Sequence, residues 1–368
     1  MVPARDARAR YPAVATRGPD PRGRALDAER RNGLPSFRGF FMDQASNDPA
    51  VETTGRPFAT RTYEARKAHE AREAHDKRAP LVDAWYGSGA APIEAVDSHA
   101  HVFLRSLPRI PSARHSPEYD ATLESYVAHL SACGITHAVL VQPSFLGTDN
   151  HFFVDALARY PQRFRGIAVV NPCTAEDEFA RLEATDVVGI RLNLVGLPIP
   201  DFTAPRWRAL LARANALGWH VEVHRRAADL PAIIPALLDQ SCRVVVDHFG
   251  RPAPHLGTLD PGFRFLLSIA GTGQVWVKLS AAYRNIGSGD GTAFGTRAAR
   301  ALLGAFAPNR LVWGSDWPHT QHRDRTDYQT TRSALDDWVP DPSLRRIILC
   351  DSARALFRFD RQTPARDT

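Results

Sequence analysis

The chain of 368 residues lacks the features that define several classes of protein. Its four cysteines are scattered without a C-x-x-C pair, which excludes a disulfide framework and favours buried thiols in a reducing compartment. No stretch approaches about 18 consecutive apolar residues, and no apolar core of signal-peptide length follows the basic start. We therefore expect a cytoplasmic protein without a membrane segment.

Lysine is also scarce, and the positive charge is unevenly placed. Only Lys67, Lys77 and Lys278 occur, although Lys and Arg together number 46. A net charge of +6 would suit a nucleic-acid-binding protein, but residues 1–90 hold most of the surplus, with 16 basic and 12 acidic residues. The rest of the chain has no basic stripe interleaved with aromatic residues. Binding of nucleic acid or a membrane surface through residues 1–90 is the remote alternative, and we expect neither partner.

Residues 1–90 differ in composition from the rest of the chain. They are rich in Arg, Ala and Pro and short of periodic apolar runs. Only Thr60–Arg78 has a helical pattern, and that pattern is polar nearly all round. Such a segment buries too little apolar surface to offset the entropy of ordering it. We expect residues 1–90 to be a largely disordered extension and residues 91–368 to be one folded domain.

Residues 91–368 alternate between short β-branched runs and stretches with helical spacing. The runs expected as strands are Ile93–His99, His137–Gln142, Arg165–Val170, Val187–Asn193, Trp219–His224, Arg243–His248, Val275–Ser280 and Arg310–Asp316. The clearest helical stretches are Tyr119–Cys133, Asn150–Arg159, Arg206–Leu217, Leu230–Gln240 and Ala293–Phe306. Eight strand–helix units in about 270 residues predict an α/β protein with a parallel (β/α)8 (TIM) barrel. A doubly wound open sheet is the alternative, but the G-x-G-x-x-G turn usual after its first strand is missing.

Polar residues follow the ends of these strands, where TIM barrels carry their active sites. His99 and His101 lie two residues apart at the end of the first run, so we expect both rings on one face. His224, His248 and Asp316 close the fifth, sixth and eighth runs. Imidazole and carboxylate groups in this pattern suit either one divalent metal ion, such as zinc, or donors that polarise a carbonyl group.

The order H-x-H, His, His, Asp on strands one, five, six and eight resembles the amidohydrolase superfamily, of the amidohydrolase-2 type, over Ile93–Phe357. Longer phrases resemble its 2-pyrone-4,6-dicarboxylate lactonase group: DSHAHVF at 97–103, GITHAVLVQPSFLGTDN at 134–150, GIRLN at 189–193, VVDHFGRP at 245–252, VWVKLSAAYR at 275–284 and WGSDWPHTQH at 313–322. The resemblance implies a hydrolase that opens a carboxylated lactone, such as a pyrone dicarboxylate or a muconolactone, in the breakdown of aromatic compounds. A decarboxylase of the same superfamily is the alternative reaction.

The resemblance also implies catalytic roles for individual residues. It makes Asp316 the general base that activates water. It makes His99, His101 and His248 the groups that polarise the lactone carbonyl. In the lactonase group this chemistry proceeds without a metal ion.

Arginines bind the substrate carboxylates in the lactonase group, and matching strand ends here carry Arg191, Arg251 and Arg284. The residues themselves favour the same conclusion. Guanidinium groups around one pocket repel one another unless an anion is bound, and each can hold a carboxylate through two hydrogen bonds. We therefore expect a small anionic, carboxylated substrate. Three residues after strand two are expected either to bind it or to cap the next helix: Ser144, Thr148 and Asn150.

Two departures from the superfamily bear on the metal. Members with two metals use a carboxylated lysine on strand four, where this chain has Arg191, so a bridged dinuclear site is not expected. The metal-free lactonase has a residue other than histidine at the end of strand five, where this chain has His224. The sequence leaves open a metal-free site or a single divalent ion, with zinc as the expected metal. Its ligands would come from His99, His101, His224, His248 and Asp316.

The remaining polar residues near the strand ends are interpreted mainly as structural: His220 and Glu222 in a buried layer, Asp97 pointing inward below His99, and Asp247 and Lys278 deeper or on the other face. His319 and His322 follow Asp316 in the chain, and substrate contact is an open possibility for both.

Overall fold

The computed structural model describes residues 92–287 and 289–360. The expectation that residues 1–90 form a largely disordered extension lies outside these residues. Among the described residues, no helix is long and apolar enough to cross a membrane.

Eight parallel strands form one sheet in chain order, which confirms the predicted barrel. The strands are β1 (Val96–Ala100), β2 (His137–Val141), β3 (Phe164–Ala168), β4 (Val187–Asn193), β5 (His220–His224), β6 (Val244–Val246), β7 (Val275–Ser280) and β8 (Leu311–Gly314). A parallel bridge between Ala100 and Trp317 joins the first strand to the residues after the last. Hydrogen bonds from Asp316 N to His99 O and from His101 N to Trp317 O, both 2.8 Å, complete this junction.

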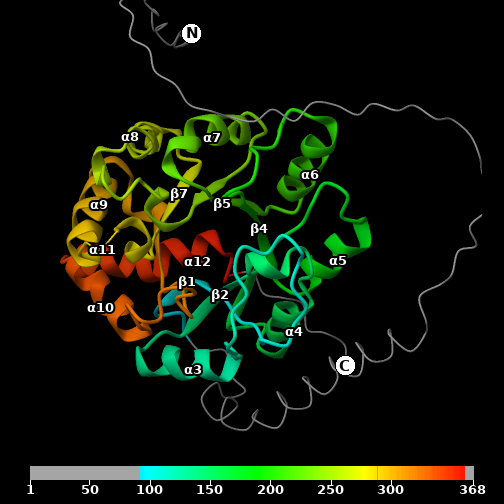
Figure 1. Cartoon of the computed structure of the whole chain (residues 1–368), viewed down its shortest axis with the longest axis horizontal. Coiled ribbons are helices and arrows are strands. Elements are labelled where there is room, and N and C mark those ends of the chain that lie inside the picture. The colour runs from blue at the N-terminus through cyan, green and yellow to red at the C-terminus, as the bar shows by residue number, and fades with distance from the viewer. Residues whose placement is uncertain (1–91, 288, 361–368) are drawn as a thin grey trace, which may run out of the picture. The chain divides into compact units, whose positions relative to one another are not determined.

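Helices surround the strands, as Figure 1 shows. They are α3 (Leu123–Ala132), α4 (His151–Arg159), α5 (Glu176–Ala184), α6 (Pro205–Ala216), α7 (Leu230–Leu238), α8 (Pro261–Ser268), α9 (Gly291–Ala305), α10 (Tyr328–Trp338), α11 (Pro342–Arg346) and α12 (Ser352–Leu356). Local chemistry sets several of their starts. Thr122, Asp260 and Asp327, for example, accept hydrogen bonds from backbone N–H groups of the first turns of α3, α8 and α10.

Apolar residues close the barrel at the end where the strands begin. Val96, the first residue of β1, belongs to a buried cluster with Phe357, which directly follows α12. The ring of Phe357 also contacts His220, the first residue of β5, with 5.3 Å between the ring centres. Because the amino-terminal end of the barrel is filled in this way, a site can open only at the carboxyl ends of the strands.

Candidate active site

Five predicted residues gather where the strands end. His99 lies in β1 and His101 just after it, His224 ends β5, His248 begins the short 3-10 helix His248–Gly250 after β6, and Asp316 follows β8. The His99 ring lies 4.9 Å from that of His101 and 4.8 Å from that of His248, between centres. The structure therefore brings together the histidines and the carboxylate that the sequence singled out.

The backbone around these residues is strained. His248, Ala281 and Asp316 all have positive φ angles, of 53°, 49° and 59°. Residues with a Cβ rarely adopt this conformation, and where they do the surrounding structure must enforce it. The strain turns the chain sharply after β6, β7 and β8 and directs side chains into the barrel mouth. It also explains why β6 ends at Val246, before the predicted His248.

Asp97 differs from its predicted orientation. Its carboxylate accepts hydrogen bonds from the Tyr126 and Tyr328 hydroxyls, on α3 and α10, at 2.8 and 3.0 Å, so it points toward the helix layer rather than inward. It also accepts from the backbone N and the Oγ of Ser315. The pairing register shifts between Asp97 and Ala100, which breaks the alternation on which the expectation relied. Asp97 joins β1 to the start of the loop that carries Asp316.

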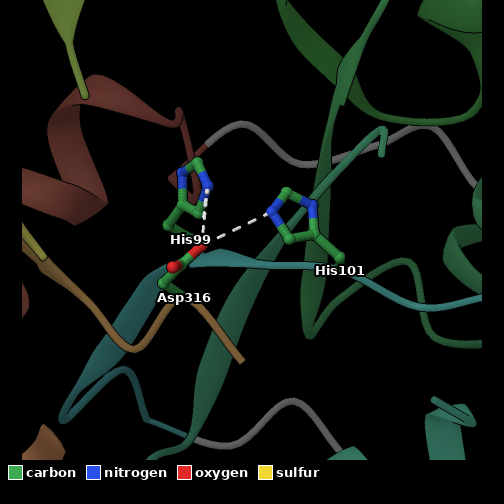
Figure 2. Close-up of side chains that lie close together, drawn as sticks. All are labelled: His99, His101 and Asp316. Carbon is green, nitrogen blue, oxygen red and sulfur yellow. Dashed lines mark ion pairs between the residues drawn. The ribbon is translucent and has the colours of Figure 1, made fainter. Parts of the chain in front are cut away.

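The two oxygens of the Asp316 carboxylate have different surroundings. Oδ1 faces the Nε2 atoms of His99, His101 and His248 at 3.7, 3.6 and 3.9 Å, and Figure 2 shows the first two of these contacts. Oδ2 accepts hydrogen bonds from the Tyr283 hydroxyl and from Arg284 Nε, both 2.6 Å. The carboxylate is thus held from one side and open toward the histidines on the other.

Charges around Asp316 keep it ionised. Burial by itself would raise its pKa, but Arg284 and then His248 and His101 hold the pKa of Asp316 well below its usual range. Tyr283 responds in the opposite direction, because burial and the Asp316 charge raise the pKa of its hydroxyl well above the usual value. Tyr283 therefore remains a hydrogen-bond donor, and Asp316 a carboxylate.

Beneath the histidines lies a layer of buried charges. Arg191 donates to Asp247 Oδ2 from Nε and Nη2, at 2.9 and 2.8 Å. Lys278 Nζ lies 2.5 Å from Glu222 Oε1 and 3.0 Å from His99 Nδ1. The buried layer expected from His220 and Glu222 is present, since both are fully buried.

A cavity of about 300 Å³ opens at the barrel mouth. Asp316, His101 and His248 line it, together with Arg251 and Arg284. Arg251 has no hydrogen bond or ion pair to a carboxylate among the described residues. Burial and the charge of Arg284 lower the pKa of Arg251 to about 10, so the side chains that line the cavity compensate its positive charge poorly. Such a wall is suited to an anionic ligand.

The three residues predicted after β2 have different positions. Ser144 lines the cavity. Thr148 is exposed and does not line it. Asn150 is buried, and its side chain bonds to the backbone of Thr148 and Val169 rather than capping α4. Asn150 therefore holds the loop to the chain after β3.

Arg191 and His319 also differ from a simple substrate-binding role. Arg191 lines the cavity, but its guanidinium is already paired with Asp247. His319 is buried, with Nδ1 3.3 Å from the Tyr283 hydroxyl, whereas His322 lines the cavity.

The sequence reasoning did not assign roles to Arg114, His115 or Tyr283. Arg114 and His115 lie in the segment between β1 and α3 and line the cavity. The other site residues were predicted from their position at strand ends, and this segment contains no strand end. Tyr283 directly precedes the predicted Arg284, and only this position in the sequence could have indicated a role in the site.

Two groups of described residues each offer three possible metal ligands within 4.8 Å of one another. One is His99, His101 and Asp316, and the other is His99, Asp247 and His248. His224, which was expected as a further ligand, belongs to neither group. Its ring packs edge-on against that of His248, with centres 5.0 Å apart.

Comparison with known proteins agrees with this geometry. The amidohydrolase family model matches residues 96–359. The crystal structure of a putative 2-pyrone-4,6-dicarboxylic acid hydrolase from Pseudomonas putida is 42% identical, covers 74% of this chain and 100% of its own, and has a TM-score of 0.70. A 2-pyrone-4,6-dicarboxylate hydrolase of Comamonas testosteroni is 30% identical over 293 residues, which are 74% of this chain and 94% of the relative. A 4-sulfomuconolactone hydrolase of Rhizobium radiobacter is 30% identical over 278 residues, covering 73% and 92%. The chain therefore belongs to the amidohydrolase family.

Proposed function

We propose that this protein hydrolyses a small lactone that carries carboxylate groups. The observation that carries the proposal is the Asp316 carboxylate, ionised and held on one side by Arg284 and Tyr283, with three imidazoles facing its free oxygen. The relatives named as hydrolases of a pyrone dicarboxylate and of a sulfomuconolactone support the substrate class.

The residues divide the reaction between them. Asp316 Oδ1 takes a proton from water, which attacks the lactone carbonyl carbon. His99, His101 and His248 surround the same space and stabilise the negative charge that develops on the carbonyl oxygen. When the ring C–O bond breaks, the proton held by Asp316 passes to the leaving oxygen, which gives a free hydroxyl or enol group and a new carboxylic acid that then loses its proton to solvent.

Arg284 and Tyr283 keep Asp316 in one orientation. Because its pKa is so low, Asp316 is a weak base when no anion is bound. A bound anion strengthens it. A substrate carboxylate near Arg284 and Arg251 offsets their positive charge and excludes water, which raises the affinity of Asp316 for a proton. Substrate binding is therefore coupled to the strength of the base.

The ligand types suit zinc, but their contacts do not. Both possible metal groups contain His99, whose Nδ1 contacts the Lys278 amine at 3.0 Å. Arg284 contacts the Asp316 carboxylate and Arg191 that of Asp247, so a positive charge already offsets each possible acidic ligand. We derive no step through a metal, and the proposed chemistry uses the side chains alone.

A direct test uses the purified protein with 2-pyrone-4,6-dicarboxylate and 4-sulfomuconolactone as separate substrates. Ring opening followed by ultraviolet absorbance, without release of carbon dioxide, is the expected result for at least one of them. Failure to open either lactone would contradict the proposed substrate class, and carbon dioxide release would select the decarboxylase alternative.

Chelation and zinc addition are expected to leave the rate unchanged. Protein dialysed against a chelator, with metal content measured by elemental analysis, should hydrolyse the lactone with the same kcat before and after zinc is restored. The reason is that the positively charged Arg284 and Lys278 contact Asp316 and His99, two of the possible ligands, and would repel a bound cation. A kcat that falls on chelation and returns with zinc would show that a metal takes part.

Arg251→Met is expected to raise KM by about 10- to 100-fold, the loss of one charge-assisted hydrogen bond, with kcat changed much less. The reason is that Arg251 lines the cavity without a carboxylate partner among the described residues. The matched control is Arg226→Met, because Arg226 is exposed and does not line the cavity. Equal KM values for the two variants would remove Arg251 from the binding site.

A further inference from the structure

Lys278 lies inside the barrel below His99, and the proposed hydrolysis assigns it no task. It is fully buried, and it is the only lysine in residues 91–368. Its Nζ atom faces three groups: Glu222 Oε1 at 2.5 Å, His99 Nδ1 at 3.0 Å and Asp247 Oδ1 at 3.5 Å. An apolar side chain could fill the same space in the barrel, so the amine beside His99 calls for a further explanation.

The charges around Lys278 define its protonation state. Arg191 and Lys278 face the carboxylates of Glu222 and Asp247, so the four charges balance. Burial would raise the pKa of Glu222, but Lys278 and then His220 lower it to about 2. The Glu222 carboxylate, at 2.5 Å, is the ion-pair partner of the amine. Lys278 is therefore an ammonium group, which has three N–H donors and no acceptor.

This donor determines where the proton of His99 resides. An ammonium cannot accept a hydrogen bond, so the His99 Nδ1 atom that it contacts must present its lone pair. A histidine ring with a lone pair on one nitrogen is neutral and has one proton. That proton must be on Nε2. Nε2 has no hydrogen-bond partner among the described residues and faces Asp316 Oδ1 at 3.7 Å.

His101 has the opposite arrangement. Its Nδ1 lies 2.7 Å from the backbone carbonyl oxygen of Val141, which can only accept, so this nitrogen carries a proton. The two histidines of the H-x-H pair therefore differ at Nδ1, where His101 donates a hydrogen bond and His99 accepts one. Figure 2 shows both rings directed at that carboxylate.

We propose that Lys278 is a positioning residue that holds the proton of His99 on Nε2, so that His99 donates a hydrogen bond to the carbonyl oxygen of the lactone. The inference rests on the proposed hydrolysis for the identity of that acceptor. The position of the proton rests only on the contacts of Lys278. With this proton bound, Nε2 has no lone pair to offer a metal ion.

The test combines nitrogen NMR with a charge-balanced variant. Protein labelled with 15N-histidine shows for each ring which nitrogen is bonded to a proton, and the His99→Gln spectrum identifies the His99 signals. Lys278→Met with Glu222→Gln removes the donor without leaving Glu222 as a buried charge. In this double variant the nearest partner of His99 Nδ1 is Asp247 Oδ1, at 3.5 Å. Glu222→Gln alone is the matched control, because it keeps Lys278 beside His99.

We expect His99 to be protonated on Nε2 in the native protein and in Glu222→Gln, and on Nδ1 in the double variant. Loss of one donor to the developing oxyanion should lower kcat of the double variant by about 100-fold relative to Glu222→Gln, with KM changed little. A role in folding alone would not move the proton between ring nitrogens.

Two results would overturn the inference: a native His99 protonated on Nδ1, or a double variant that keeps Nε2–H. The native spectrum decides the first even if the double variant does not fold. A native Nε2–H in a protein that opens no lactone would contradict the proposed function and leave the proton assignment standing. A protein that hydrolyses the lactone but has His99 protonated on Nδ1 would support the proposed function and contradict the proton assignment.

Discussion

Asp316→Asn is expected to lower kcat by about 10⁴-fold, the upper range for loss of a general base. The amide cannot take a proton from water, whereas its carbonyl oxygen can still accept from Tyr283 and Arg284, so the fold around it is kept. Steady-state hydrolysis of the preferred lactone measures the effect, and circular dichroism verifies folding.

The control for this variant is Asp324→Asn. Asp324 is exposed in the same segment between β8 and α10, and it does not line the cavity. Its substitution should leave kcat unchanged. An Asp316→Asn enzyme that keeps most of the native rate would remove Asp316 from the role of base and with it the proposed order of proton transfers.

Arg191→Met is expected to lower the free energy of unfolding by about 3–5 kcal/mol, because it leaves the fully buried Asp247 without its main partner. Arg191 is 3% exposed and donates twice to that carboxylate, so its charge is compensated inside the protein. Urea denaturation followed by tryptophan fluorescence measures the loss of stability.

Arg251→Met serves as the comparison for Arg191→Met. Arg251 has no carboxylate partner among the described residues, so its removal should change KM far more than stability. If Arg191→Met kept its stability and only raised KM, the pairing with Asp247 would be unimportant. Arg191 would then return to the substrate-binding role that its strand-end position suggests.

The strands were the most predictable part of the molecule. The predicted bounds of Val187–Asn193 and Val275–Ser280 match β4 and β7, because both runs begin just after turn residues and are rich in apolar side chains. The predicted Arg243–His248 was too long. The backbone stays extended through Asp247 but turns at His248, whose positive φ no pattern of residue types reveals.

The site was predictable to the extent that it lies at strand ends. His99, His101, His248 and Asp316 were found in this way, and they converge in the structure. Arg114, which lines the cavity, comes from a connecting segment without such a marker. The orientation of Asp97 was wrong because a one-residue shift in strand pairing reverses the side to which a side chain points.

The sequence by itself determined the barrel, the family and the residue types at the barrel mouth. These follow from local periodicity and from motifs a few residues long. Only the tertiary structure decided how the charges are paired: Arg191 with Asp247, Arg284 with Asp316, and Lys278 with Glu222 and His99. The partners in these pairs lie 32 to 179 residues apart in the chain. Barrel closure brings them within hydrogen-bond distance, and burial makes each pairing matter, because an uncompensated charge inside the barrel would be costly.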